Sequence, residues 1–200
     1  YLGADFKTAS PGMRFGMFLP LWNAQFEKLQ ESTPALQQAT RLTNNDSATM
    51  QALLQRQQQV FYNLPSLESK FTATAVGIAP FATGLGNEHP TENGFAFLNP
   101  YGLPYLPASS VKGVLRQAAR ELANGDWGEN QGWNEAAITA LFGYESEAND
   151  TDQQRGALIF WDVLPQLAGD KLEVEVMTPH QKHYYQNGES PHDSGQPLPL

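Results

Sequence analysis

The stretch from residue 80 to residue 107 constrains the fold most, because it is too interrupted to form a long helix or strand. It contains four glycines and repeated prolines, which break regular backbone structure. It is also rich in aromatic side chains: Phe81, Phe95, Phe97, Tyr101 and Tyr105. Loops longer than about 12–15 residues are usually functional or disordered, and this aromatic content favours an ordered loop. We therefore expect one long ordered loop between two regions of regular structure.

The region before this loop has the pattern of helices. From about residue 23 to residue 64 it is rich in Gln and poor in Gly, and apolar residues recur at helical spacing: Leu53, Leu54, Val60, Phe61 and Leu64. A break is expected near residues 43–47, where Asp46 and Ser47 would suit a helix N-cap. The interleaved Leu, Met and Phe residues favour a packed helical layer over a disordered tract.

Three segments have the pattern of strands. Residues 71–78 alternate with a period of two, and residues 157–163 form a short apolar run. Residues 171–177 alternate charged with apolar side chains, which predicts a half-exposed strand. A sheet is therefore expected to begin near Lys70, and we divide the chain into residues 1–69, a helical extension packed on the core, and residues 70–200, the main domain.

Two helices are predicted between these strands. The first runs from Ser109 to Asn124, with a serine N-cap at its start and Gly125 as its stop. The second runs from about residue 134 to residue 142 and stops at Gly143.

The charge of the chain limits how it could bind nucleic acid. Twelve Lys and Arg residues stand against 21 Asp and Glu residues, a net charge of −9, which argues against a free-standing binder of nucleic acid. No Lys or Arg lies between Phe71 and Val111, and then Lys112, Arg116 and Arg120 follow at a spacing of four. Any such role must therefore be local to this helix.

The spacing of these three cations predicts an amphipathic helix. At about 100° per residue they lie within roughly 80° of one another. Apolar residues fall on the opposite side: Val111, Val114, Leu115, Ala118 and Leu122. We expect the apolar face to pack and the cationic face to be presented outward.

The start of the same helix is a candidate anion site. Its first amides, the helix dipole and the hydroxyls of Ser109 and Ser110 could together hold a phosphate. The preceding glycines would let a polynucleotide backbone approach closely. The alternative interpretation is an ordinary solvated helix whose Lys and Arg residues are surface charges.

The four histidines suggest chemistry only weakly. His180, His183, His89 and His192, together with Asp162, could be drawn as a metal site or as a general acid and base. No HExxH spacing is present, so hydrogen bonding or stacking on RNA is favoured over metal binding, and no metal or cofactor is predicted. The chain has no cysteine, which excludes disulfides and thiolate chemistry and fits a cytoplasmic location.

Several motifs taken together resemble the RAMP superfamily of CRISPR effector subunits. They are the run from Thr83 to Asn87, Glu92-Asn93-Gly94, and the segment from Leu103 to Arg116 with its SSxKGxxR stretch. Leu141-Phe142-Gly143, the segment 156–162 and the segment 176–185 are similar to the sixth subunit of the Cmr module of type III-B effectors. The resemblance covers about residues 71–190.

The resemblance implies an α+β fold with a ferredoxin-like, RRM-type antiparallel core and an added helical layer. It also implies a further strand beyond Leu200, so we expect either that the C-terminal strands of the core are missing or that the sheet is completed differently. The implied role is that of a non-catalytic subunit that binds the CRISPR RNA near its 3′ side, contacts target RNA and assembles with other Cmr backbone subunits. No enzyme activity is expected of it.

The candidate RNA-binding residues follow from the resemblance and the charge pattern together. They are Ser109, Ser110, Lys112, Arg116, Arg120, Gly84, Gly86, Asn87, His89, Asn93, Gly94 and His180. Two alternatives stay open at this point. One is an RNA-cleaving enzyme of the same superfamily with His180 or His183 as general base. The other is a scaffold whose basic helix docks on acidic surfaces of partner proteins.

Overall fold

The computed structural model describes residues 6–29, 31–65, 69–144, 154–177 and 198–199. These residues form two compact units, one from the described residues within 1–104 and 165–200 and one from those within 105–164. Each unit is described by itself below. The boundary predicted between residues 69 and 70 stays a prediction.

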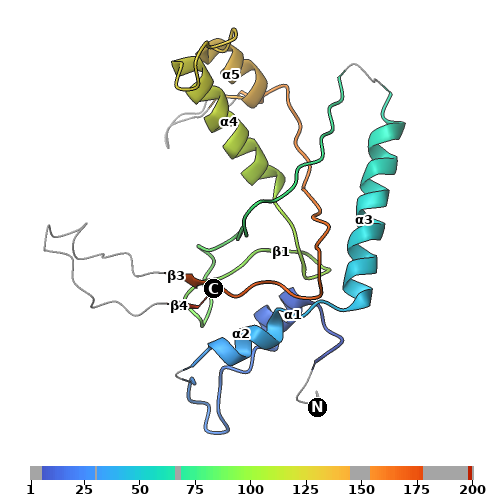
Figure 1. The fold of residues 1–200 in the computed structure, drawn as a ribbon, viewed down its shortest axis with the longest axis vertical. Helices are drawn as coiled ribbons and strands as arrows, with labels where there is room; N and C mark the ends of the chain where they lie inside the picture. The colour runs from blue at the N-terminus through green and yellow to red at the C-terminus, as the bar shows by residue number, and fades with distance from the viewer. Residues whose placement is uncertain (1–5, 30, 66–68, 145–153, 178–197, 200) are drawn as a thin grey trace, which may run out of the picture. The chain divides into compact units, whose positions relative to one another are not determined.

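Three helices lie in the first unit: α1 (Pro11–Met17), α2 (Thr33–Ala39) and α3 (Asn44–Asn63), as Figure 1 shows. Helix α1 was missed by the sequence analysis, although Ser10 followed by Pro11 is a common start signal. The helices predicted over residues 23–64 are α2 and α3. Residues 23–29 instead form turns and a bridge between Trp22 and Lys28.

The break predicted near residues 43–47 is confirmed, but the capping residue is different. Thr43 caps α3: its side chain accepts the Asp46 amide at 3.1 Å, and the Asp46 carboxylate accepts the Thr43 amide at 2.8 Å. This reciprocal pair satisfies two amide donors at the start of the helix. Asp46 therefore acts from the third helical position. The prediction that Asp46 or Ser47 is the N-cap is wrong.

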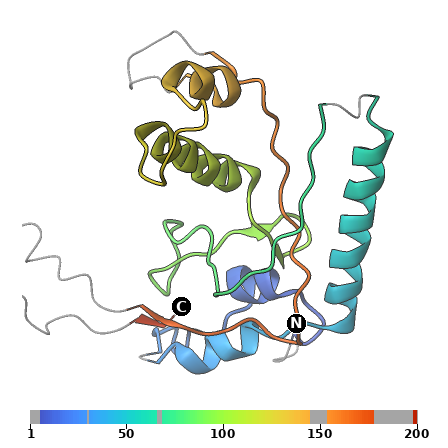
Figure 2. The ribbon, with the colours of Figure 1, turned by 45° about the horizontal axis from the view of Figure 1, so that its top comes forward.

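The core of the first unit lies where α1 meets α2. Phe15, Leu36 and Ala39 are buried together, and Leu19, Phe95 and Phe97 pack against them. The buried guanidinium of Arg14 fixes the two helices to each other, because it donates to the carbonyls of Gln38 and Arg41 near the end of α2. Helix α3 extends away from this core (Figure 2), and its buried residues are confined to its first turns. The packed layer expected over residues 23–64 is therefore limited to α2 and the start of α3.

The strands are shorter than predicted. β1 (Phe97–Leu98) pairs antiparallel with β2 (Leu103–Pro104), and β3 (Val176–Met177) pairs antiparallel with β4 (Leu198–Pro199). Among residues 154–175 the structure has only isolated bridges, such as that between Leu106 and Val163. The predicted strands over 157–163 and 171–177 are thus reduced to bridges and a two-residue strand.

The strand predicted over residues 71–78 does not form in the described part of the chain. These residues are assigned no strand, and all of them are exposed, Ile78 completely so. An alternating pattern fixes the faces of a strand but supplies no partner for its backbone hydrogen bonds. The described residues form a mixed α and β structure, as predicted, and they do not form the ferredoxin-like sheet.

The second unit consists of α4 (Ala108–Asn124) and α5 (Glu135–Phe142), which lie against each other in Figures 1 and 2. Both helix ends agree with the sequence analysis: Gly125 closes α4 with a φ of 81°, and Gly143 closes α5. A residue with a side chain is strained at that φ, so glycine is the favoured stop of α4. The core consists of Ala119, Ile138 and Phe142, with Ala123, Trp133, Leu141 and Phe160 packed against it.

Candidate nucleic-acid interface

The start of α4 is built differently from the predicted serine cap. The helix begins at Ala108 with Pro107 as its N-cap residue, and no side chain of the cap accepts a hydrogen bond. Instead the Ala108 amide donates to the Asp162 carboxylate at 2.7 Å. Asp162 is brought there by the bridge between Leu106 and Val163, whose two backbone hydrogen bonds measure 3.0 and 2.9 Å. The prediction of a serine N-cap is therefore wrong. The first amide is satisfied instead by Asp162, which lies 54 residues away in the sequence.

This arrangement changes what the helix start offers to an anion. The first amide of α4 already donates to the Asp162 carboxylate, so a phosphate at that position would be repelled by the negative charge of Asp162. The next two amides, of Ser109 and Ser110, have no acceptor inside the helix. Both serines are exposed, and Lys112 is half-buried. The first turn of α4 thus carries two exposed hydroxyls and two amides without a helical acceptor, and Lys112 follows them.

The packed side of α4 is also not the predicted one. Arg116 is half-buried, and its guanidinium donates to the Gly143 carbonyl, which follows the last turn of α5. Ala119 is buried on the same side, whereas Val114 and Leu115 are exposed. The side that packs therefore includes a cation, and the prediction that the apolar face packs and the cationic face points outward is wrong. The reason is that a helix C-terminus attracts a positive charge and leaves carbonyls to be satisfied.

The second group of predicted residues lies in the loop before β1, in the first unit. Gly84 has a φ of 77°, and a Cβ there would clash with Ala96, whose amide donates to the Thr83 carbonyl at 2.7 Å. A Cβ on Gly94 would clash with Asn87. These two glycines are required by the fold of the loop itself. Gly86 differs, because it is exposed and open space surrounds the position of a Cβ.

His89 holds this loop onto α1. Its ring stacks on Phe15 with centroids 4.0 Å apart, and Nε2 lies 3.2 Å from the Phe15 carbonyl oxygen. Nδ1 accepts the Thr91 amide at 3.3 Å, so the neutral ring with its proton on Nε2 fits both contacts. Burial lowers the pKa of His89, and the hydrogen bond to Phe15 opposes this shift in part. Both nitrogens are thus engaged inside the protein.

The remaining predicted residues differ in their surroundings. Asn87 is exposed, and Asn93 is half-buried, with its side-chain nitrogen buried and without an acceptor among the described residues. Arg120 is half-buried on α4. His180 lies outside the described residues, as do His183 and His192. The structure therefore gathers the predicted residues into two groups, one in each unit.

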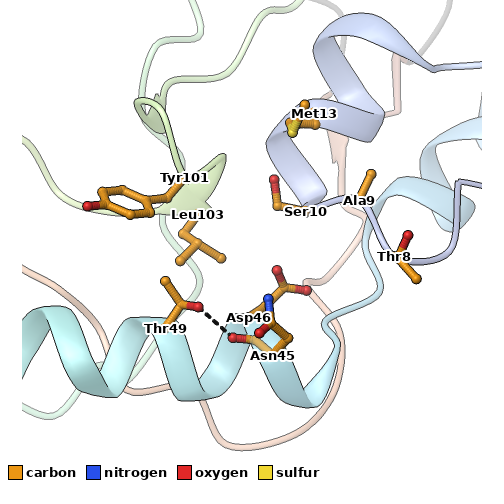
Figure 3. A pocket seen from close by; sticks show the side chains of 9 residues that line it. All are labelled: Thr8, Ala9, Ser10, Met13, Asn45, Asp46, Thr49, Tyr101 and Leu103. Atoms are coloured by element: carbon orange, nitrogen blue, oxygen red, sulfur yellow. Dashed lines mark hydrogen bonds between the residues drawn. The ribbon is translucent and has the colours of Figure 1, made fainter.

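A hollow of about 220 Å³ lies in the first unit (Figure 3). Thr8, Ala9, Ser10, Met13, Asn45, Asp46, Thr49, Tyr101 and Leu103 line it. The carboxylate in this hollow belongs to Asp46. It accepts hydrogen bonds from the Thr43 amide at 2.8 Å and from the Thr43 hydroxyl at 2.7 Å, so this carboxylate is part of the N-cap of α3. None of the predicted site residues lies there.

Two further tests of the described residues concern metals and membranes. No three His, Asp or Glu side chains of the described part of the chain gather as ligands for a metal ion. None of the described helices is both long and apolar enough to cross a bilayer.

Comparison with known proteins identifies the family. The model of the RAMP superfamily matches residues 74–195, which is more than half of the chain. The chain belongs to the RAMP superfamily. The resemblance seen in the SSxKGxxR stretch and the glycine-rich loop is thereby confirmed, since both lie inside the matched residues.

One curated relative extends this RAMP assignment. The chain is 27% identical over 165 residues to the "CRISPR system Cmr subunit Cmr6" of Pyrococcus furiosus, an alignment that covers 58% of this chain and 48% of the relative. The chain thus spans about half the length of the relative it matches. No solved structure matches.

The hydrogen bond from Arg116 to Gly143 leads to a prediction about stability. Replacing Arg116 by Ala removes a charged donor from the carbonyl of the buried Gly143, and we expect the free energy of unfolding to fall by about 2 kcal/mol. Lys112→Ala, one turn earlier on the same stripe, should change it by less than about 0.5 kcal/mol. Urea unfolding followed by circular dichroism measures both. Equal stabilities of the two variants would contradict the role assigned to Arg116.

The lowered pKa of His89 leads to a prediction about pH. Because the folded state favours the neutral ring, its contribution to stability is complete above the ordinary pKa of 6.5 and is lost as the pH falls below that value. His89→Gln keeps a donor for the Phe15 carbonyl but does not titrate. The urea midpoint of the wild type should therefore fall more than that of the variant between pH 7.5 and pH 5.5. An equal fall of the urea midpoint in the two proteins would contradict the role assigned to His89.

Proposed function

We propose that this chain is a non-catalytic, RNA-binding subunit of a type III-B (Cmr) RNA-guided complex in the cytoplasm. The observation that carries the proposal is the RAMP match over residues 74–195, because it includes the SSxKGxxR stretch at the start of α4. The similarity to a relative named as a Cmr subunit supports the choice of complex. In this role the chain holds the CRISPR RNA near its 3′ side, beside target RNA and the other backbone subunits.

The first turn of α4 is the principal contact in this proposal. Ser109 and Ser110 offer exposed hydroxyls and amides at the positive end of a helix of 17 residues. Lys112 adds an ammonium half a turn later. The Asp162 carboxylate keeps phosphate away from the first amide, so the phosphate would lie over the serines. Arg116 then acts as a positioning residue, because it fixes the angle at which this turn is presented.

The glycine-rich loop is the second contact, on the other unit. Gly86 and Asn87 are exposed, and none of the described residues fills the space beside Gly86. A nucleic-acid backbone could approach there without meeting a side chain. Gly84, Gly94 and His89 support this contact indirectly, because they fix the shape and attachment of the loop.

The net charge of −9 sets the conditions for binding. A chain with this charge repels RNA at long range, and one cationic turn cannot offset that repulsion alone. Binding is therefore expected within an assembly whose other subunits supply further positive charge. Weak binding by the isolated chain follows from the same reasoning.

Lys112 is the residue that tests RNA binding, because its removal leaves the Arg116 contact intact. We expect Lys112→Ala to lower retention of the CRISPR RNA by the assembled complex and to reduce the slope of log retention against log salt by about 0.7–0.9, the value of one lost phosphate contact. Lys171→Ala, an exposed lysine of the other unit, is the matched control. Retention that stays unchanged across the salt titration would refute the role of the α4 turn.

Absence of catalysis is tested separately. We expect the purified chain to leave CRISPR repeat RNA and target RNA intact over hours, since the proposed contacts hold phosphates and donate hydrogen bonds to them. The readout is gel electrophoresis of end-labelled RNA. Cleavage by the wild type that disappears in His180→Ala would overturn the non-catalytic assignment, and Lys112→Ala serves as the control for loss of binding.

A further inference from the structure

One side of α4 carries an apolar hollow that the proposed RNA contacts do not use. Six residues line this hollow of about 350 Å³: Gly113, Val114, Gln117, Ala118, Glu121 and Trp127. We call these six residues the α4–Trp127 surface. By helical geometry their positions on α4 lie opposite the stripe of Arg116 and Ala119 that packs on α5. The hollow therefore opens on the side of α4 away from α5.

The exposure of this surface is unusual for its chemistry. Val114 is 69% exposed and Trp127 is 63% exposed, and both line the hollow. Exposed apolar side chains are common singly, but a cluster around a hollow marks a site of interaction. Aromatic residues, Trp above all, are the side chains that most often dominate protein interfaces.

The charges around the surface select among occupants. Within the described residues 121–144 there is no Lys or Arg, and four residues are acidic: Glu121, Asp126, Glu129 and Glu135. Glu121 lines the hollow, and the exposed Asp126 and Glu129 lie within two residues of Trp127. Lys112 and Arg116 fall on the other stripe of the helix, and Arg120 lies between the two stripes. A phosphate backbone would be repelled here, whereas a cationic segment would be attracted.

We propose that the α4–Trp127 surface docks a basic amphipathic segment of a partner protein. An apolar side chain of that segment enters the hollow against Val114 and Trp127, and Lys or Arg residues beside it pair with Glu121, Asp126 and Glu129. This division into an apolar centre and a charged rim is the usual anatomy of a protein interface. The proposal rests on the proposed function in one respect only, namely that the partner is sought in the same complex.

The first experiment tests the surface without the complex. The full chain is titrated with a helical peptide that has Leu at every third or fourth position and Lys elsewhere, and with the same peptide carrying Glu in place of Lys. We expect a saturable blue shift of tryptophan emission with the basic peptide only, which weakens as salt rises and vanishes in Trp127→Phe. No saturable shift, or an equal response to both peptides, overturns the proposal.

Two exposed residues of equal exposure give a matched pair of variants. Val114 and Ile159 are 69% and 70% exposed in the same unit, and only Val114 lines the hollow. We expect Val114→Asp to weaken peptide binding at least tenfold and Ile159→Asp to leave it unchanged. Should Val114→Asp disturb the helix, the double variant Asp126→Lys, Glu129→Lys changes only exposed residues and should also weaken binding tenfold. Equal binding by all variants is the overturning result.

The second experiment identifies the occupant in the assembled complex. A carbodiimide joins carboxylates to lysines in direct contact, and we expect it to link Asp126 or Glu129 to a lysine of another subunit, with Val114→Asp abolishing the link. Links to lysines of this chain alone, or ultraviolet crosslinking of RNA to Trp127, overturn the proposal. Absence of the wild-type chain from a Cmr complex refutes the proposed function, whereas the peptide titration still decides the docking surface.

Discussion

The hydrogen bond from the Arg116 guanidinium to the Gly143 carbonyl decides which side of α4 is packed. A helix can present any of its sides to a neighbour, and here the choice is made by a cation that satisfies the C-terminal end of α5. Ala119 is buried on the same side, where it packs with Ile138 and Phe142. The exposure of Val114 on the opposite side of α4 goes with this contact and this packing.

This orientation divides the second unit by charge. The first turn of α4 combines Ser109, Ser110 and Lys112 and is suited to an anion, whereas the segment after Arg120 carries only acidic charge as far as residue 154. If both proposals hold, the opposite charges would let one small unit hold RNA at one place and a cationic protein at another without competition between them. Such a division suits a subunit that joins a nucleic acid to its neighbours.

Sequence patterns predicted best what depends on a few neighbouring residues. The stop at Gly125, the helix at residues 134–142 and the family membership were all predicted, because each depends on local backbone preference or on a linear motif. Predictions that needed a partner failed. The strand over residues 71–78 had the right alternation, but the described chain provides no neighbouring strand for it.

The site shows the same limit. The residue types of the site could be read from the sequence, but their roles could not. Gly84 shapes the loop and His89 anchors it, and of the loop glycines Gly84, Gly86 and Gly94 only Gly86 faces open space. The sequence by itself determined that an acidic chain of this length carries one basic helix start after a glycine-rich loop. Only the tertiary structure decided that Asp162 occupies the first amide and that Arg116 points into the protein. The physical reason is that a charged side chain takes the partner nearest in space, and linear spacing does not reveal which partner that is.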